Sequence, residues 1–313
     1  MKEIIYAIFL SFFLCGLCGN AEAKKKKEVK KAIKREVQTP YDKLFKGKKA
    51  FTVNGLMKMH LMAGKVYAEF PIELLNRDLA LTSSIEDISD NGEGVVGQFA
   101  GRVNQFRFTL QDSMLQARLV RRYGVKNTGM GKNADQIIER SNTPGIFQSY
   151  KILAYTPDKK AVVVDMTELF LESSRLTNPF PSYAGNSLYG FVQRIHKFQS
   201  QRSELLGICG NDNSMSVHCN LGFNVDRLVL GSFMQAKDVP VSVTVNKILM
   251  LLPEDPMRPR LADSRIGVNA IIQTELPDVC QGIKTYYITK RWRIEPVDEI
   301  RYKQGEMVDV KKP

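Results

Sequence analysis

The chain has 313 residues and a mass of 35.4 kDa, a length that suits one large domain or two ordinary ones. With 43% hydrophobic and 25% charged residues it has enough apolar side chains for a packed core, which excludes wholesale disorder. The net charge of +12 raises the question of a polyanionic partner, so the position of that charge along the chain matters.

The first 23 residues have the pattern of a secretory signal peptide. Lys2 gives the basic start, an apolar run extends from Ile4 to Leu17, and Ala23 closes a small-residue cleavage site. The apolar run is shorter than the ~20 residues that a transmembrane helix needs. Lipidation at Cys18 is the alternative to cleavage after Ala23, although Leu17 stands where a small residue is wanted. We therefore expect an exported protein that is periplasmic, associated with the outer membrane, or extracellular.

Residues 24–38 predict a Lys-rich disordered tether. Between Lys24 and Glu36 there are eight basic and two acidic residues, so this stretch alone carries +6. Such a block repels itself and has almost nothing to bury. Its function is either weak attraction to an anionic envelope surface or that of a solvated linker. Because half of the net charge lies here and the chain is expected to be exported, we expect no nucleic-acid partner.

The body of the chain alternates like an antiparallel β-protein. In 217–225 the odd positions are apolar and most even positions are polar, and further strands are predicted at 56–62, 65–70, 103–110, 115–119, 150–155, 161–164 and 241–245. Asn54-Gly55 is the pair that a type I′ hairpin turn prefers. Helices are predicted at 133–140 and 166–176.

These patterns predict a mainly β fold with a few helices (α+β). The expected domains are a small N-terminal β module over 39–93 and a larger antiparallel sandwich or open-barrel-like domain over 94–300.

The sequence offers no catalytic constellation. None of the three histidines starts an HExxH motif, and neither a nucleophile elbow nor a phosphate-binding loop is present. We expect no catalytic residue, metal ligand or cofactor site in this chain. Cys209 and Cys219 flank a turn-rich stretch and leave two alternatives open, a cross-strand disulfide or two buried thiols.

One segment is unusual. Residues 252–267 hold three Pro, three Arg and three acidic residues, and Pro makes such a segment stiff and extended. Arginine–carboxylate pairs on a stiff loop are suited to holding two parts of a protein together. The alternative is a surface crossover with scattered ion pairs.

This segment resembles a known family. Its elements Pro-Met-Arg-Pro-Arg at 256–260 and Asp-Ser-Arg-Ile-Gly at 263–267, with Arg-Trp-Arg-Ile-Glu-Pro at 291–296, look like the signature of secreted zinc-dependent metalloproteases of Bacteroidota. Residues 41–47 and 88–92 are similar to the beginning of the same family. The part that is resembled is the pair of N-terminal domains of unknown function, which precede a metzincin-like catalytic domain.

The resemblance implies a function without catalysis. The HExxHxxGxxH motif of that catalytic domain is absent here, so zinc is expected only in that domain, and this chain is expected to be inactive alone. Residues 301–313 are expected to begin the linker toward it, in a chain truncated or encoded separately.

The expected role is to support or dock the catalytic domain, in cis or in trans. The interface residues would be Arg258, Arg260, Asp263, Arg265 and Trp292. The alternative function is a stand-alone binding or structural module of the cell envelope with no protease partner.

Overall fold

The computed structural model describes residues 38–101, 103–120, 126–127, 140–173, 177–180, 185–187, 190–229, 233–255, 257–263, 265, 270–276, 284–291 and 294–310. The expected signal peptide, nearly all of the expected tether, Trp292, and the expected helix at 133–140 apart from Arg140 lie outside these residues. The chain divides into two units, Met1–Lys46 and Gly47–Pro313.

The described part of the first unit holds one short helix, α2 (Pro40–Phe45). Its N-terminus is a capping box: Thr39 Oγ1 accepts from the Asp42 N–H at 3.1 Å, and Asp42 Oδ2 accepts from the Thr39 N–H at 3.1 Å. Pro40 occupies the first helical position, where its missing N–H has no helical partner to lose.

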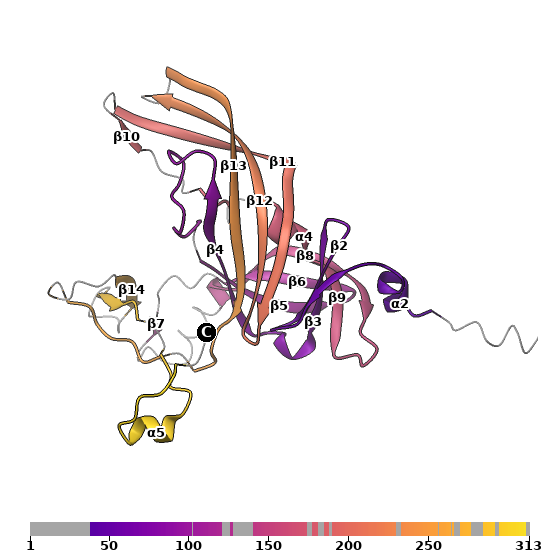
Figure 1. The fold of residues 1–313 in the computed structure, drawn as a ribbon. Helices are drawn as coiled ribbons and strands as arrows, with labels where there is room; N and C mark the ends of the chain where they lie inside the picture. Colours follow the sequence, from indigo (N-terminus) through magenta and orange to yellow (C-terminus); the bar gives the residue numbers. More distant parts are fainter. Residues whose placement is uncertain are drawn as a thin grey trace, which may run out of the picture. The chain divides into compact units, whose positions relative to one another are not determined.

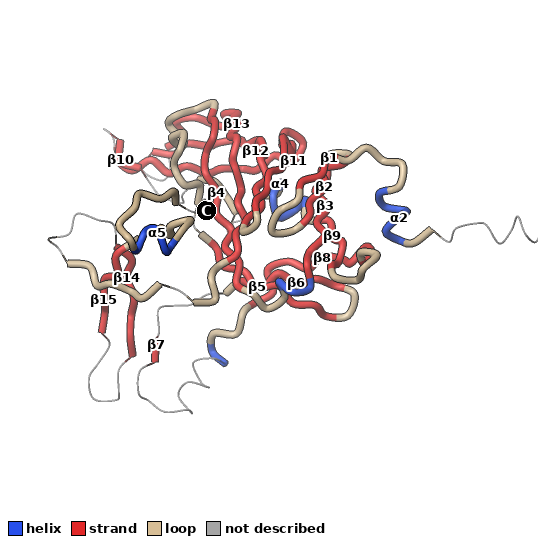
Figure 2. The backbone as a smooth tube through the Cα atoms, turned by 60° about the horizontal axis from the view of Figure 1, so that its bottom comes forward, coloured by secondary structure: helices blue, strands red, loops and turns tan. Residues whose placement is uncertain are grey.

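The second unit is mostly β-structure (Figure 2). Twelve strands form one sheet in the order β1-β2-β3-β9-β8-β6-β5-β4-β13-β12-β11-β10, and all its neighbouring pairs are antiparallel. The sheet does not close into a barrel. The strands are β1 (Phe51–Val53), β2 (Lys58–Met62), β3 (Lys65–Pro71), β4 (Asp78–Ile88), β5 (Asn104–Gln111), β6 (Met114–Leu119), β8 (Gly145–Tyr155), β9 (Ala161–Asp165), β10 (Gly185–Ser187), β11 (Gly190–Asn211), β12 (Ser214–Val229) and β13 (Phe233–Leu251). The expected mainly β, antiparallel fold class is therefore confirmed.

The order of the strands does not follow the chain. β9 lies between β3 and β8, and β13 pairs with β4 across some 160 residues of sequence, so β1–β4 and the later strands share one sheet. The three longest strands, β11, β12 and β13, lie side by side as a long ribbon (Figure 1).

The predicted alternation explains the core. On β12 the odd residues from Met215 to Val225 are buried, while Ser216, His218 and Asn220 on the other face are only half-buried. Two apolar clusters result on this face of the sheet. One is centred on Phe70, Phe106 and Phe108, and the other on Cys219, Leu221 and Phe223.

The turn prediction at Asn54-Gly55 is wrong. Neither residue has a positive φ, and the connection from β1 to β2 spans four residues. Ala63 (φ 51°) and Gly64 (φ 71°) adopt the left-handed conformations instead, in the two-residue turn of the β2–β3 hairpin. The register of the hairpin, with Met62 opposite Lys65, leaves Ala63-Gly64 as its two-residue turn, as expected for a Gly-containing pair between two apolar runs.

Two more expectations have clear outcomes. The helix expected at 166–176 is the shorter α4 (Thr167–Leu171), where Asp165 Oδ1 accepts from the Thr167 N–H at 3.0 Å. Cys209 and Cys219 are both free thiols, the first exposed and the second buried. A disulfide does not form because Cys209 lies opposite Ser216, whereas Cys219 lies opposite Leu205.

The C-terminal part has a small sheet of its own. β15 (Lys284–Thr289) pairs antiparallel with β14 (Ala270–Leu276), which pairs parallel with β7 (Lys126–Asn127). The last helix, α5 (Glu299–Lys303), is capped by Asp298, whose Oδ1 accepts from the Ile300 and Arg301 N–H groups at 3.0 Å each. A short 3-10 turn, η1 (Ile72–Leu74), follows β3 in the main sheet.

Among the described residues no helix is long and apolar enough to span a bilayer.

Candidate interface at the C-terminal sheet

The unusual Pro- and Arg-rich segment runs in an extended conformation beside β15. The Thr289 N–H donates to the Arg260 carbonyl at 2.9 Å and the Ala262 N–H to the Tyr287 carbonyl at 2.6 Å, with Leu261 opposite Ile288. The Arg291 guanidinium also donates to the Arg258 carbonyl. The segment thus adds a short antiparallel bridge to β15 at 260–262.

This sheet exposes apolar side chains on both faces. Ile271 and Ile272 are neighbours on β14 and therefore point to opposite faces, yet their exposed fractions are 50% and 65%. Leu261 lies in register with Ile288 and Ile271, and its exposed fraction is 65%. Tyr287, in register with Ile272, is 54% exposed. A sheet normally covers at least one face with a second layer, so these rows of side chains form a candidate interface. We call them, with Arg258 and Arg260, the C-terminal surface.

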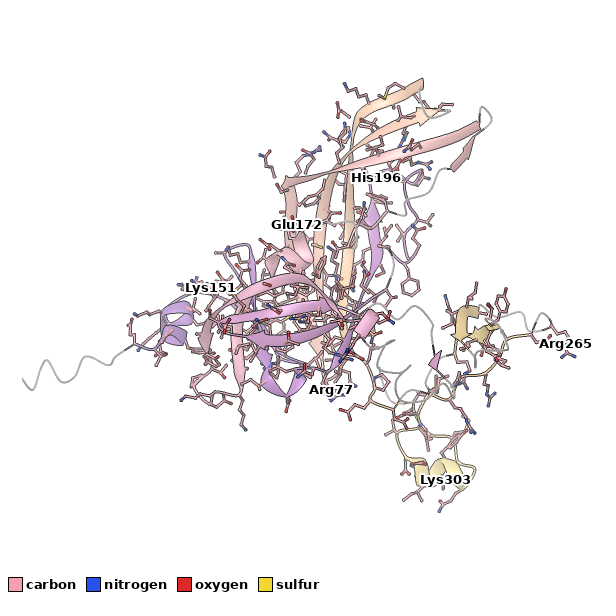
Figure 3. The ribbon with its side chains drawn as sticks, turned by 180° about the vertical axis from the view of Figure 1, so that it is seen from behind. Arg77, Lys151, Glu172, His196, Arg265 and Lys303 are labelled. Atoms are coloured by element: carbon pink, nitrogen blue, oxygen red, sulfur yellow. The ribbon has the colours of Figure 1, made fainter. Side chains whose placement is uncertain are left out.

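Arg258 and Arg260 carry charge at this surface. Both are exposed, and within the described ranges neither guanidinium has an ion-pair partner. Asp263 and Arg265 instead pair with each other, through Nε–Oδ1 at 2.9 Å and a second guanidinium nitrogen to Oδ2 at 2.7 Å. This bidentate hydrogen bonding from Arg265 lowers the pKa of Asp263. The Arg265 side chain is 87% exposed and projects from the outer end of its segment (Figure 3).

The structure therefore brings together only some of the residues that the sequence indicated. Arg258 and Arg260 lie beside β15, Asp263 and Arg265 form a local pair, and Trp292 lies outside the described residues. Sequence reasoning missed the exposed apolar residues of β14 and β15. The available signal was a pair of adjacent isoleucines in a strand, which places one of them on each face.

A second polar cluster lies on the ribbon, at the segment that follows β4. The Glu93 side chain is fully buried and receives hydrogen bonds from Arg227 Nε at 3.0 Å and from an Arg227 terminal nitrogen at 2.8 Å. His196 Nε2 lies 2.7 Å from the other Glu93 oxygen, and its ring stacks on Phe180 with 4.1 Å between centroids. His196 lies on the ribbon (Figure 3). We call this cluster, with Arg194 and Asp90, the Glu93 clasp.

The electrostatics of the clasp favour an ionised Glu93. Burial opposes ionisation, but hydrogen bonds from His196 and Arg227, with the charges of His196 and Arg194, keep the pKa of Glu93 below its usual range. Arg227 also pairs with Asp90 at 2.5 Å and lowers the pKa of that carboxyl. The clasp therefore fastens residues 90–93 to β11 and β12.

The other two histidines also pair with glutamates. His60 Nε2 lies 2.9 Å from Glu69 Oε1, and both buried side chains are on the face of β2 and β3 opposite the apolar cluster. Thr52 Oγ1 lies 2.8 Å from His60 Nδ1. His218 Nδ1 lies 2.9 Å from Glu86 Oε2. These pairs sit on separate parts of the sheet, and within the described ranges no cluster of three or more His, Cys, Asp and Glu could hold a metal ion.

One lysine is buried between the two apolar clusters. Lys247 on β13 is 1% exposed, and its Nζ donates to the Glu172 carbonyl at the end of α4, at 3.1 Å. Burial lowers the pKa of Lys247 to about 8, against opposing effects of Cys219 and Glu172. Burial likewise raises the pKa of the neighbouring Cys219 thiol to about 11, which makes it a poor nucleophile.

The fold and the surface together define the class of this protein: an open antiparallel β protein with an exposed apolar and cationic C-terminal surface. The chain belongs to the DUF5117 family, a domain of unknown function whose family model matches residues 97–297. A second domain of unknown function, DUF5118, matches residues 38–88. Comparison with curated proteins gives no match, and comparison with solved structures gives none either.

Proposed function

We propose that the chain is the non-catalytic region of an exported zinc-dependent metalloprotease, and that it supports or docks the catalytic domain. The signature residues at 256–260 and 291–296 are the basis for the protease family. The observation that carries the docking role is the exposure of Ile271 and Ile272 on opposite faces of β14.

The C-terminal surface suits a partner with apolar and acidic groups. The exposed side chains of Ile272 and Tyr287 offer apolar area whose removal from water favours association. Arg258 and Arg260 offer guanidinium groups that can bind carboxylates in a bidentate manner. Burial of the apolar rows supplies affinity, and the arginines supply orientation and specificity.

The test is association with a metalloprotease catalytic domain of the resembled family. The full chain and this domain are co-expressed, and the complex is measured by co-purification and by analytical ultracentrifugation. We expect Ile272→Lys, and separately the double charge reversal R258E/R260E, to weaken association at least tenfold. Ile272 is 65% exposed, so I272K should leave the stability of the chain nearly unchanged.

A matched control reverses two lysines elsewhere. Lys151 and Lys160 are exposed on and beside β8 and β9, and the K151E/K160E variant changes the net charge by the same amount. Association unchanged in all three variants would reject the C-terminal surface as the docking site, and no association in the unaltered pair would reject the proposed function.

A further inference from the structure

The ribbon carries a polar groove on the face opposite its core. A hollow of about 250 Å³ is lined by Asp87, Ile88, Ser89, Leu206, Asn220, Ser242 and Thr244. Asn220, Ser242 and Thr244 alternate along their strands with the buried Leu221, Val243 and Val245, so the groove lies on the face that α4 does not cover. It belongs to neither the C-terminal surface nor the Glu93 clasp.

The register of four strands builds this groove. Asp87 on β4, Thr244 on β13, Asn220 on β12 and Glu204 on β11 lie opposite one another in a single row across the sheet. β11 shifts register between Leu205 and Gly207, and this irregularity sets Leu206 beside the groove with an exposed fraction of 51%. The hollow therefore has a polar floor and an apolar wall.

The polar floor has unused hydrogen-bonding capacity. Among the described residues, the side chains of Asn220, Ser242 and Thr244 make no hydrogen bond to protein. Asn246, two positions along β13 on the same face, has a buried Oδ1 with no partner. Native structures rarely leave a buried acceptor such as the Asn246 Oδ1 unmatched, and the exposed or half-buried groups of the hollow beside it can exchange their water for a polar ligand.

The combination of groups selects the ligand chemistry. Two hydroxyls and an amide can each donate and accept, and the Asp87 carboxylate accepts, which matches a ligand whose hydroxyl groups also do both. The exposed Leu206 side chain gives an apolar wall for the C–H face of a ring, whereas Ile88 lies opposite Val243 and packs on the buried side of the sheet. Glu86, Asp87 and Glu204 place negative charge around the groove, which disfavours anionic ligands.

We propose that this groove binds one or two rings of a neutral oligosaccharide. Its volume is just below the roughly 300–1,000 Å³ of drug-sized sites, which suits a short part of a longer chain. Binding uses Asn220 and Thr244 as the central hydrogen-bonding pair and Asp87 as the acceptor at one end. The proposal does not depend on the protease assignment.

The experiment titrates the full chain with neutral hexasaccharides by isothermal calorimetry: cellohexaose, maltohexaose, laminarihexaose, mannohexaose and N-acetylchitohexaose. We expect at least one to bind with a dissociation constant in the millimolar range or tighter. Asn220→Ala and Thr244→Val should each weaken this binding about three- to tenfold, in line with one lost hydrogen bond.

Ser216→Ala is the matched control. Ser216 lies on the same strand and face, four residues or roughly 13 Å from Asn220, and should leave binding unchanged. The proposal is overturned if none of the hexasaccharides binds, or if N220A and T244V bind as tightly as the unaltered chain. Binding at these residues only of a Gly-Ser decapeptide or of polygalacturonate would likewise overturn it, in favour of a peptide or an anionic glycan.

Discussion

Lys247 shows how one residue can join two apolar clusters while opposing their stability. Its Nζ satisfies the Glu172 carbonyl, one of the acceptors that the end of α4 leaves without a helical partner. To reach this carbonyl the Lys247 ammonium leaves water, and this desolvation lowers its pKa. The burial of Lys247 could not be predicted from the apolar pattern of β13, because every other buried position on that face holds an apolar residue.

Lys247 should make stability depend on alkaline pH. Its pKa is about 8 in the folded chain and 10.5 as an ordinary lysine, so the folded state binds fewer protons between these values. The free energy of unfolding should therefore rise from pH 8 to 10.5, by about 3 kcal/mol if the full difference is expressed. Lys247→Met should lack this rise and should be the more stable chain at pH 7, by about 1 kcal/mol or more, because no charge is buried. Urea denaturation at pH 7 and pH 10 measures both effects.

A control for this lysine is Lys151→Met, which removes an exposed charge from β8. It should follow the unaltered chain across the whole pH range. Parallel pH profiles for K247M and the unaltered chain would show that Lys247 does not titrate in this window.

At the scale of elements, the Glu93 clasp fixes the segment between β4 and β5 to the ribbon. Three cationic or potentially cationic side chains, Arg194, His196 and Arg227, face one buried carboxylate that comes from a turn about 100 to 130 residues away in sequence. The removal of one partner from such a group leaves buried charge uncompensated. The clasp therefore connects two distant parts of the chain in a way that backbone pairing alone does not.

Glu93→Gln should destabilise the chain by about 3 kcal/mol at pH 7, since it leaves Arg194 and Arg227 without their buried counter-charge. The pKa of Glu93 is lowered in the folded state, so its stabilisation is present above the unfolded value and is lost as the pH falls through the folded one. E93Q should thus lose less stability than the unaltered chain on acidification below about pH 4.3. Denaturation midpoints at pH 7 and pH 3.5 test this, with Glu73→Gln, an exposed carboxylate beside β3, as the control. A midpoint at pH 7 within error of the unaltered chain would refute the role assigned to the clasp.

At the scale of the whole molecule, local sequence patterns predicted where strands form better than they predicted which strands pair with each other in the sheet. Alternation identified the buried face of β12 correctly because one face of the sheet is covered and the other is not. The insertion of β9 between β3 and β8 could not be predicted, because it depends on packing between segments about 100 residues apart. For the candidate interface, proline content predicted an extended segment over 252–267, and the structure shows extended chain at 257–262. The exposure of Ile271 and Ile272 could not be predicted, because it depends on which other segments pack against β14.

The shared sheet also determines how the molecule should unfold. The family models divide the chain between residues 88 and 97, yet the first apolar cluster draws on both sides of this division. Phe70 lies on β3 and Phe108 on β5, with 4.8 Å between their ring centroids, and Leu249 of β13 belongs to the same cluster. A core shared in this way couples the two matched segments into one cooperative unit.

We therefore expect Phe70→Ala and Leu249→Ala to destabilise one common transition. Each side chain is fully buried, so each truncation should cost about 3–5 and 2–5 kcal/mol, respectively. Far-ultraviolet circular dichroism and pulse proteolysis should report the same denaturation midpoint within each variant, because neither half retains a complete core when the other unfolds. Two separated transitions, with F70A moving only one and L249A only the other, would mean that the matched segments are independent domains despite their continuous sheet.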